Sequence, residues 1–287
     1  MRYVIADDHR VYRFSKEDPP ALRVPPGSVV EFAVRDCFDG QIDWSSFPEC
    51  LDGIDLSRVN PATGPLFGEG AKPGDTLEVE ILDVKVDGMG FVDRMRFPIS
   101  GGKAELPGGA ILPIRPVIGV IGVAPDGEPV DTKTPGDHGG NLDTADITVG
   151  SKVYLPVQVE GALLAMGDLH ALQGDGEVSG QGIEIGGRVT VRVDVARLDL
   201  PRKPVVELDD RICIIASAPS LDEACDEAVK ASKEWLSRRL NISEREALIL
   251  MSLTCDLRIS QIVNPLKTVR LCIPKAVLKP NSSSSEV

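Results

Sequence analysis

Two segments of the chain alternate hydrophobic and polar residues strictly. Residues 76–81 alternate over six positions and residues 188–195 over eight. Because successive side chains of a strand point to opposite faces, this period of two predicts half-buried β-strands. Further β candidates are residues 29–34, 118–123 and 152–159, which are separated by turns rich in proline and glycine. The first two hundred residues are therefore predicted to be mostly β.

The last third of the chain changes to a helical period. Ser220 with Glu223 forms a capping box, and the apolar residues that follow recur at the spacing of one helix face. Ser243 with Glu246 repeats this start signal before a second apolar run. We therefore predict two antiparallel helices, which form a hairpin over about residues 220–258, and a return strand at about 267–273.

These elements define the expected fold class. The 28 glycines and 22 prolines lie mostly between the β runs, and no strand–helix alternation of a doubly wound sheet is present. We predict an α+β fold that is mostly β, with an antiparallel β-sandwich or barrel-like body over residues 1–215 and a C-terminal helical hairpin. Residues 1–280 are expected to form a single domain, and the serine-rich residues 281–287 a disordered tail.

Charge excludes two classes of partner. The chain of 287 residues carries 31 basic and 44 acidic residues, a net charge of −13. This charge repels the phosphate backbone and anionic lipid surfaces, so we expect neither nucleic acid nor a membrane as a partner. The first ten residues lack the pattern of a signal peptide, and the six cysteines show no short paired spacing. Buried free thiols and a cytoplasmic location are the expectation.

Candidate chemistry is concentrated between residues 137 and 177. Two of the three histidines, His138 and His170, lie in this segment, each close to an aspartate and flanked by glycine-rich sequence. Imidazole and carboxylate groups are common ligands of divalent metal ions, and glycines let the backbone approach a small site closely. The segment is interpreted as a metal-centred active site.

The spacing of these residues supports a shared site. If residues 162–171 form a strand, Asp168 and His170 project from the same face. A tight turn at residues 174–176 would return Glu177 toward them, while His138 would come from a separate loop. A lone histidine is more often an ordinary core or surface residue, and Gly-Asp-Gly is common turn chemistry. The spacing therefore indicates a site without naming its reaction.

Several longer sequence motifs are similar to those of a known family. They include the segment from His138 to Asp143, the segment from Asn60 to Pro65, and above all Gly167-Asp-Leu-His-Ala-Leu-Gln-Gly-Asp-Gly-Glu177. In these words, which run in family order over about residues 30–275, the chain resembles the acetamidase/formamidase family of amide hydrolases. It departs from that pattern at residues 135–137 and at Ser179, where cysteine is common, and these departures bear on the identity of the substrate.

The resemblance implies hydrolysis of a short aliphatic amide, formamide or acetamide, to a carboxylate and ammonia. A divalent ion, with zinc as the first choice, would be held by His138, Asp168 and His170 and would activate a water molecule. Asp36 is a further candidate ligand, with a turn-capping role as its alternative. Asp143 is either an acceptor that fixes an imidazole tautomer or a ligand of a second, oxygen-rich calcium site.

Three further residues receive candidate roles in the reaction. Glu177 or Glu69 would transfer the proton from water to the leaving nitrogen, although the glycine-flanked Glu69 also suits a surface turn. The Asn141 amide would help to polarise the substrate carbonyl.

Other functions remain open from the sequence. Cys37 is the best candidate for a thiol nucleophile, which would make the protein a cysteine-dependent amidase. A γ-lactam is an alternative substrate, and a metal-stabilised β-protein without catalysis is the alternative from another class. The resemblance further implies a homo-oligomer, but no segment of the chain marks its interface.

Overall fold

The computed structural model describes residues 2–106 and 108–278. The expected disordered tail at 281–287 lies outside these residues. Within them, no helix combines the length and the apolar character that a membrane-spanning helix needs.

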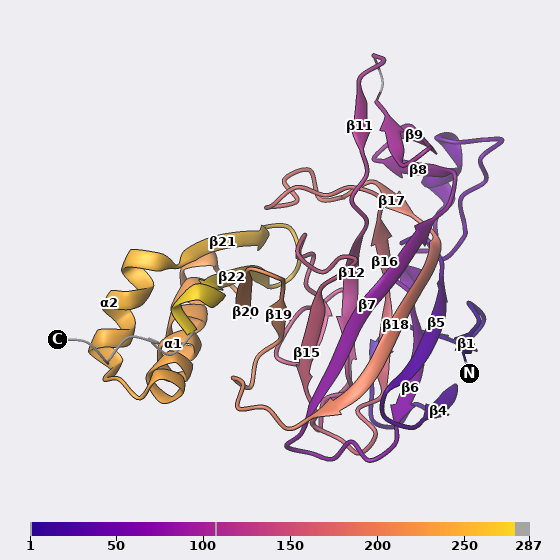
Figure 1. Cartoon of the computed structure of the whole chain (residues 1–287). Helices are drawn as coiled ribbons and strands as arrows, with labels where there is room; N and C mark the ends of the chain where they lie inside the picture. The colour runs from indigo at the N-terminus through magenta and orange to yellow at the C-terminus, as the bar shows by residue number, and fades with distance from the viewer. Residues whose placement is uncertain (1, 107, 279–287) are drawn as a thin grey trace.

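Two large sheets make up most of the described chain (Figure 1). The first has nine strands in the order β1 (Arg2–Ile5), β5 (Ser28–Val34), β18 (Gly187–Ala196), β7 (Thr76–Val86), β15 (Lys152–Pro156), β19 (Val205–Glu207), β20 (Arg211–Ala218), β22 (Lys267–Pro274) and β21 (Asp256–Gln261).

The second sheet carries the segment with the candidate chemistry. Its main path runs β11 (Ile111–Pro113), β10 (Lys103–Glu105), β9 (Met95–Ser100), β8 (Met89–Val92), β17 (Glu184–Ile185), β16 (Leu164–His170), β12 (Val117–Gly122) and β14 (Gly139–Asn141). Strand β6 (Ala62–Gly68) also pairs with β16, and β2 (Arg10–Val11) and β4 (Leu22–Val24) pair with β6. A separate two-stranded sheet joins β3 (Arg13–Phe14) to β13 (Val130–Asp131).

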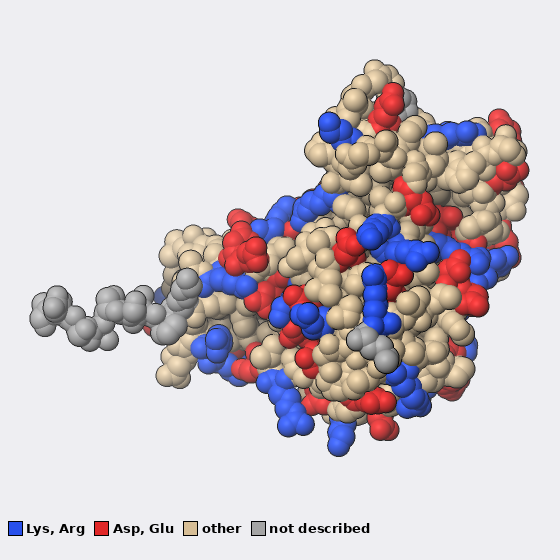
Figure 2. Space-filling view, turned by 45° about the vertical axis from the view of Figure 1, so that its right-hand side comes forward, with Lys and Arg blue, Asp and Glu red and all other residues tan. Residues whose placement is uncertain are grey.

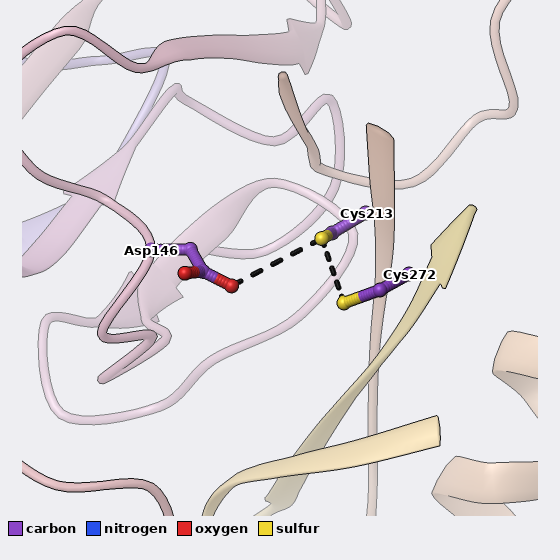
Figure 3. A group of neighbouring side chains, drawn as sticks. All are labelled: Asp146, Cys213 and Cys272. Carbon is purple, nitrogen blue, oxygen red and sulfur yellow. Dashed lines mark hydrogen bonds between the residues drawn. The ribbon is translucent and has the colours of Figure 1, made fainter. Parts of the chain in front are cut away.

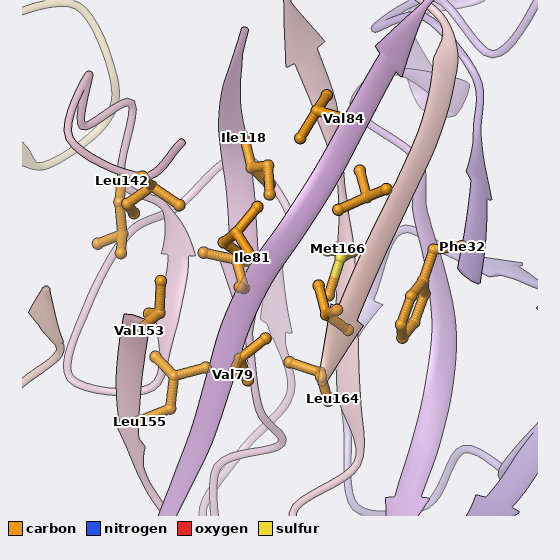
Figure 4. Close-up of a cluster of buried hydrophobic side chains, with 14 of the residues drawn as sticks. Phe32, Val79, Ile81, Val84, Ile118, Leu142, Val153, Leu155, Leu164 and Met166 are labelled. Carbon is orange, nitrogen blue, oxygen red and sulfur yellow. The ribbon is translucent and has the colours of Figure 1, made fainter. Parts of the chain in front are cut away.

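The two large sheets pack face to face around one hydrophobic core. Phe32, Val79 and Val153 come from the first sheet, and Ile118 and Met166 from the second, and all belong to the same buried cluster (Figure 4). Alternate residues of each strand point into this core, as the period-two pattern predicted. The expected mostly-β body is therefore confirmed as a sandwich.

Most predicted strands are present, with shifted ends. The segment predicted at 76–81 extends to Val86, the one at 152–159 ends at Pro156, and the one at 162–171 covers residues 164–170. The expectation of an antiparallel body needs one correction, because β1 pairs with β5 in parallel and β4 pairs with β6 in parallel.

The C-terminal hairpin is confirmed. Helix α1 (Leu221–Leu240) and helix α2 (Glu244–Thr254) both begin with the predicted capping boxes, in which Ser220 pairs with Glu223 and Ser243 with Glu246. The helices cover one face of β20 and β22 and enclose a second hydrophobic cluster that includes Trp235. The first sheet thus continues from the sandwich into a helix-covered C-terminal part (Figure 1). Short 3-10 helices occupy Glu49–Gly53, Leu56–Arg58 and Lys275–Leu278.

The surface charge is mixed rather than segregated. On the face shown in Figure 2, lysine and arginine side chains are interspersed with aspartate and glutamate. The net charge of −13 is therefore not gathered into one acidic area on this face.

Candidate active site

One imidazole and a ring of buried carboxyl groups form the centre of the candidate site. Nε2 of His170 lies 3.2 Å from Glu184 Oε1, 3.8 Å from Asp168 Oδ1 and 3.9 Å from Glu177 Oε1. Asp143 joins them, since ligand atoms of Asp143, His170 and Glu177 all lie within 4.8 Å of one another. All five residues are at most 6% exposed.

Neighbouring strands of the second sheet bring these groups together. Asp168 and His170 lie on β16, and Glu184 begins β17 directly opposite His170 in the ladder. Asp143 follows the end of β14, and Glu177 follows the turn at residues 174–176. The sequence prediction that Asp168, His170 and a returning Glu177 approach each other therefore agrees with the geometry.

The backbone is left-handed at several residues of the site. Asp143, Asp168, Glu177 and the nearby Asn60 have φ values of 41°, 54°, 45° and 50°, four of the nine such non-glycine residues in the described chain. This conformation is unfavourable for residues with a Cβ atom, and it concentrates at functional sites, where surrounding contacts enforce it. The fold holds these carboxyl groups in orientations that a relaxed strand or turn would not give.

Two glycines make room for the cluster. A Cβ atom on Gly119 of β12 would lie 2.5 Å from Asp143 Oδ1 and 3.0 Å from Asp168 Oδ2. A Cβ atom on Gly182 would lie 2.5 Å from Cγ of His170. Because real Cβ contacts are not this short, any side chain at these positions would displace a site residue.

The tautomer of His170 follows from its second nitrogen. Nδ1 lies 2.8 Å from Gln173 Oε1, and Gln173 Nε2 donates to the backbone carbonyl of Asp143 at 2.8 Å. That second bond fixes the amide orientation of Gln173, so its oxygen must accept from Nδ1–H of His170. Nε2 of a neutral ring then directs a lone pair at the carboxyl groups.

Three amide side chains support the carboxyl groups. Asn60 Nδ2 donates to Asp168 Oδ2 at 3.0 Å, and Asn264 Nδ2 donates to Asp143 Oδ2 at 2.6 Å. In the orientation that satisfies its neighbours, the Asn141 amide nitrogen donates to Asp168 Oδ2 at 3.1 Å and to Asp143 Oδ2 at 3.2 Å. Asn141 therefore lies at the site, with its donors directed at carboxylates.

The carboxyl groups have no basic partner. In residues 2–106 and 108–278, no lysine or arginine forms an ion pair with Asp143, Asp168, Glu177 or Glu184. Burial and the neighbouring Asp143 and Glu184 raise the pKa of Glu177 to about 10. Burial and Glu184 raise the pKa of Asp168 well above its ordinary value. Burial by itself lowers the pKa of His170, but Glu184 and Asp168 outweigh it and raise that pKa.

This arrangement fits a divalent cation. Anionic carboxylates buried together need either protons or a positive charge between them. Nε2 of His170 faces the group, and Glu184 Oε2 is buried without a hydrogen-bond partner among the described residues. One imidazole nitrogen with several carboxylate oxygens is a donor set that suits zinc and related ions.

His138 lies apart from this cluster. Its ring packs edge-on against Phe14 at a centroid distance of 5.1 Å, and it belongs to none of the potential metal-ligand groups in the described chain. Burial lowers its pKa to about 4, so the ring is neutral near pH 7. The sequence assigned His138 to the metal because both histidines neighbour glycine and aspartate, but the structure does not bring it to His170.

Two other candidates, Glu69 and Asp36, are absent from the potential ligand groups of the described residues. Glu69 is exposed and follows the last residue of β6. The opposite end of β6, at Ala62, is the one near the site, because Ala62 pairs with Gly167, the neighbour of Asp168. Asp36 Oδ1 accepts from the backbone N–H groups of Phe38 and Gly40 at 2.9 and 3.3 Å, which is the turn-capping alternative. Glu184 contributes to raising the pKa of Asp36, so Asp36 lies near this acid, but in the described part of the chain neither Asp36 nor Glu69 belongs to a ligand group with His170.

Cys37 borders the site but is poorly suited to nucleophilic attack. Its sulfur forms a close group with Asp168 and Glu184, and the residue is 5% exposed. Burial and these two carboxylates raise the pKa of the Cys37 thiol well above its ordinary value. Since the thiolate is the reactive form, this environment disfavours thiol chemistry.

Sequence reasoning missed Glu184, Gln173, Asn60 and Asn264. Glu184 carried the clearest signal, because it stands between Ile183 and Ile185 and is thus an acid embedded in apolar sequence. Gln173 lies three residues after His170 inside the word that carried the family resemblance. Asn264 had no comparable signal, since a hundred and more residues separate it from the carboxylate that it contacts.

A second group brings the acid Asp146 close to the thiols of Cys213 on β20 and Cys272 on β22 (Figure 3). Cys213 Sγ is 2.7 Å from Cys272 Sγ and 4.0 Å from Asp146 Oδ2. Arg270 Nε and Arg211 Nη2 contact the same carboxylate at 2.8 and 2.9 Å. These guanidinium groups neutralise Asp146 and place positive charge beside the thiols, so the group is a poor site for a cation.

A cavity of about 290 Å³ opens onto the His170 cluster. Its lining includes the carboxylates Asp143, Asp168, Glu177 and Glu184, together with apolar side chains that include Phe38. A volume near the lower limit of ordinary ligand pockets, about 300 to 1,000 Å³, suits a small ligand.

A family model describes most of the sequence around this site. The model of the Acetamidase/Formamidase family matches residues 4–96 and 123–208, which include Asp143, Asp168, His170, Glu177 and Glu184. The chain belongs to the acetamidase/formamidase family. The resemblance inferred from the sequence words is thereby confirmed.

Solved and curated proteins agree with this family. An acetamidase structure from Bacillus halodurans is 43% identical with a TM-score of 0.91, and the match covers 96% of this chain and 98% of that one. An acetamidase of Mycolicibacterium smegmatis is 27% identical over 267 residues, or 64% of this chain and 65% of that protein. A formamidase of Methylophilus methylotrophus is 27% identical over 263 residues, covering 64% and 63%.

The chain spans less than two thirds of the length of these two curated relatives. A γ-lactamase structure from Delftia acidovorans is 23% identical with a TM-score of 0.63, over 96% of this chain and 91% of that one. This similarity shows a shared fold alone.

Proposed function

We propose that this acetamidase/formamidase family member hydrolyses the C–N bond of a short aliphatic amide, formamide or acetamide, to a carboxylate and ammonia. Family membership supports the reaction class. The observation that carries the proposal is the buried Nε2 of His170, which faces Glu184, Asp168 and Glu177 at 3.2 to 3.9 Å. Such a concentration of acceptors favours a bound cation, and the adjoining cavity suits a small substrate.

Zinc is the cation that we propose. His170 would bind it through Nε2, and the carboxylates of Asp168, Glu184 and Asp143 supply the remaining donors. When bound, the ion supplies Lewis acidity that activates water and polarises a carbonyl group. We place no separate calcium ion at Asp143, because its carboxylate belongs to the same group as His170 and Glu177.

Glu177 is the proton-transfer group in this proposal. It lines the cavity, and its pKa of about 10 in the absence of a cation makes it a proton carrier rather than a permanent anion. A nearby positive charge lowers that pKa toward neutrality, which is where an acid–base catalyst works best. Glu177 can then accept a proton from water and return it to the leaving nitrogen.

The amide side chains orient the acids. Asn141 donates to both Asp143 and Asp168, so we assign it the positioning of these two carboxylates instead of direct contact with the substrate. Gln173 keeps a proton on Nδ1 of His170 and so leaves Nε2 free as a donor atom. Hydrogen bonds of this kind commonly fix the orientation and basicity of metal-binding histidines.

Assembly and location belong to the same proposal. We propose a homo-oligomer, as the family resemblance implies, in the reducing environment of the cytoplasm. All six cysteines are free thiols, which supports that environment.

The decisive experiment measures ammonia release by the purified protein from formamide, acetamide and a γ-lactam. Activity should disappear with chelation and return with added Zn²⁺, and metal content should follow it. Glu177→Gln should lower kcat on the order of 10²- to 10⁴-fold, the range of a general acid–base residue. Glu69→Gln is the matched control, because this exposed glutamate lies away from the cluster, and it should leave kcat unchanged.

Three results would count against this function. Activity that survives chelation but not thiol alkylation would transfer catalysis to Cys37. Turnover of the γ-lactam alone would replace the linear substrate with a cyclic amide. Stoichiometric metal without turnover of any of the three would favour a structural ion.

A further inference from the structure

Strand β21 is an exposed edge of the nine-stranded sheet. It pairs with β22 on one side and is the last strand in the described sheet order. Its first four residues, Asp256 to Ile259, are all exposed, and Leu257 and Ile259 are 46% and 41% exposed. A strand edge with unpaired backbone groups and apolar side chains readily pairs with another strand.

Helix α2 also exposes apolar side chains. Leu257 and Ile259 lie opposite Leu271 and Val269 in the ladder, so they point to the face of the sheet that the helices cover. On α2, Ile249 and Leu253 are four residues apart and therefore share one face of the helix, at 51% and 77% exposed. Figure 1 shows that β21 follows α2 in the C-terminal part and runs from it toward the sandwich.

The free part of the edge has a definite end. The Gly176 N–H donates to the carbonyl of Ser260 at 3.0 Å, and the N–H of Ile262 donates to the carbonyl of Gly176 at 3.1 Å. The outer edge is thus already occupied from Ser260 onward. Any added strand has to lie along residues 255–259.

A second copy of this chain matches that short edge. A two-fold axis perpendicular to the sheet pairs β21 antiparallel with itself and keeps the side-chain faces of both copies aligned. With Leu257 on the axis, Asp256 of each copy lies opposite Arg258 of the other. An axis shifted by one residue in either direction would place Asp256 against Asp256 or Arg258 against Arg258.

Charge therefore selects one register. Cross-strand pairs of opposite charge stabilise a sheet, whereas directly opposed like charges destabilise it. Asp256 has no ion-pair partner within the described chain, while Arg258 contacts Asp175 and still carries further N–H donors. The same register places the α2 helices of both copies on the same face of the joined sheet.

We propose that two copies of this chain pair through β21 about a two-fold axis at Leu257, forming one continuous sheet. This inference is independent of the amide substrate. It names the interface that the family resemblance left open, and β21 leads directly into the segment that carries Asn264 of the candidate site.

The test is the molar mass of the full chain in solution over a dilution series, with folding checked by circular dichroism. The unmodified chain should dimerise. Leu257→Arg opposes two charges at the axis and should raise the dimer Kd at least about 30-fold, the effect of losing an interface hot spot. Ile111→Arg is the control, since Ile111 is 61% exposed on β11 of the other sheet, and it should leave the Kd unchanged.

Two further measurements test the register. Asp256→Arg and Arg258→Asp should each dissociate alone, but an equimolar mixture should form a heterodimer, because every cross-strand pair then joins opposite charges. Leu257→Cys should form an intermolecular disulfide on oxidation, whereas Ile111→Cys should not. These variants test the β21 interface even if Leu257→Arg does not fold.

The proposal fails if the unmodified chain stays monomeric at every concentration. It also fails if a dimer persists in Leu257→Arg, if mixing the charge variants restores nothing, or if Leu257→Cys does not cross-link.

Discussion

The positions of the carboxyl groups in the candidate site depend on two glycines. Gly119 faces Asp143 and Asp168, and Gly182 faces the ring of His170, at distances that exclude a Cβ atom. Close packing in the interior transmits even the addition of one methyl group to its neighbours. The positions of the candidate ligands therefore depend partly on the absence of side chains at Gly119 and Gly182.

Gly119→Ala tests this dependence. The added methyl group would lie 2.5 Å from Asp143 Oδ1 and 3.0 Å from Asp168 Oδ2, so these carboxylates would have to shift. We expect cation affinity, measured by calorimetry, to fall at least about tenfold, in line with the loss of a residue that orients metal ligands. Gly127→Ala is the control, because nothing lies within 4 Å of the added atom. Equal affinities in the two variants would contradict the close approach.

His138 provides a test at the same scale. Its pKa in the folded protein is about 4, below the ordinary 6.5. The unfolded chain therefore binds the proton first, and the free energy of unfolding falls as the pH drops from 6.5 toward 4. The lowered pKa of His138 contributes about 3 kcal/mol to this loss of stability, at about 1.36 kcal/mol for each unit of pKa difference.

His138→Gln should remove that component. Urea unfolding at pH 7, 5.5 and 4.5 should show a smaller loss of stability in the variant than in the unmodified protein. Metal content should stay the same, because the ring lies apart from the His170 cluster. Loss of the metal in His138→Gln would restore this histidine as a ligand and overturn its placement here.

At the scale of elements, Arg270 of β22 joins the C-terminal part to the segments that carry the acids. Its guanidinium is fully buried, contacts Asp146 and Asp175 at 2.8 and 2.7 Å, and donates to Ser260 Oγ at 3.1 Å. Asp146 lies three residues after Asp143, and Asp175 lies two residues before Glu177. One arginine on β22 thus holds both segments through Asp146 and Asp175.

Arg270→Met should be strongly destabilising. It leaves the buried carboxylate of Asp146 without its main counter-charge, and breaking a buried ion pair from one side costs about 3–5 kcal/mol. Denaturant unfolding measures the change. Arg192→Met, which removes an exposed pair with Glu80, is the control and should cost less than about 1 kcal/mol. Similar losses in both variants would show that Arg270 has no special structural role.

At the scale of the molecule, the sandwich and the C-terminal part contribute differently to the site. Strands β12, β16 and β17 of the sandwich carry or adjoin the ligands, whereas the C-terminal part contributes Asn264 through the segment after β21. The amide of Asn264 contacts the side chain of Asp143 and the backbone carbonyl of Asn141. The orientation of the acids therefore depends on how the two parts pack, and pairing of β21 across a dimer would stabilise that arrangement.

The sequence determined the features that depend on local patterns. Period-two alternation gave the strands, two capping boxes gave the helix starts, and the words around Asp168 and His170 identified the family. These signals are local because side-chain direction and helix capping depend on residues a few positions apart. The approach of Glu177 to His170 also followed from nearby turn chemistry.

Only the tertiary structure decided which residues complete the site. Glu184 reaches His170 through a strand pairing, and Asn264 reaches Asp143 across 121 residues. Sequence proximity alone could not show that His138 packs against Phe14 or that Glu69 lies at the far end of β6. The physical reason is that sheet register and the packing of the two sheets fix which distant side chains meet, and both are set by the whole core rather than by any one segment.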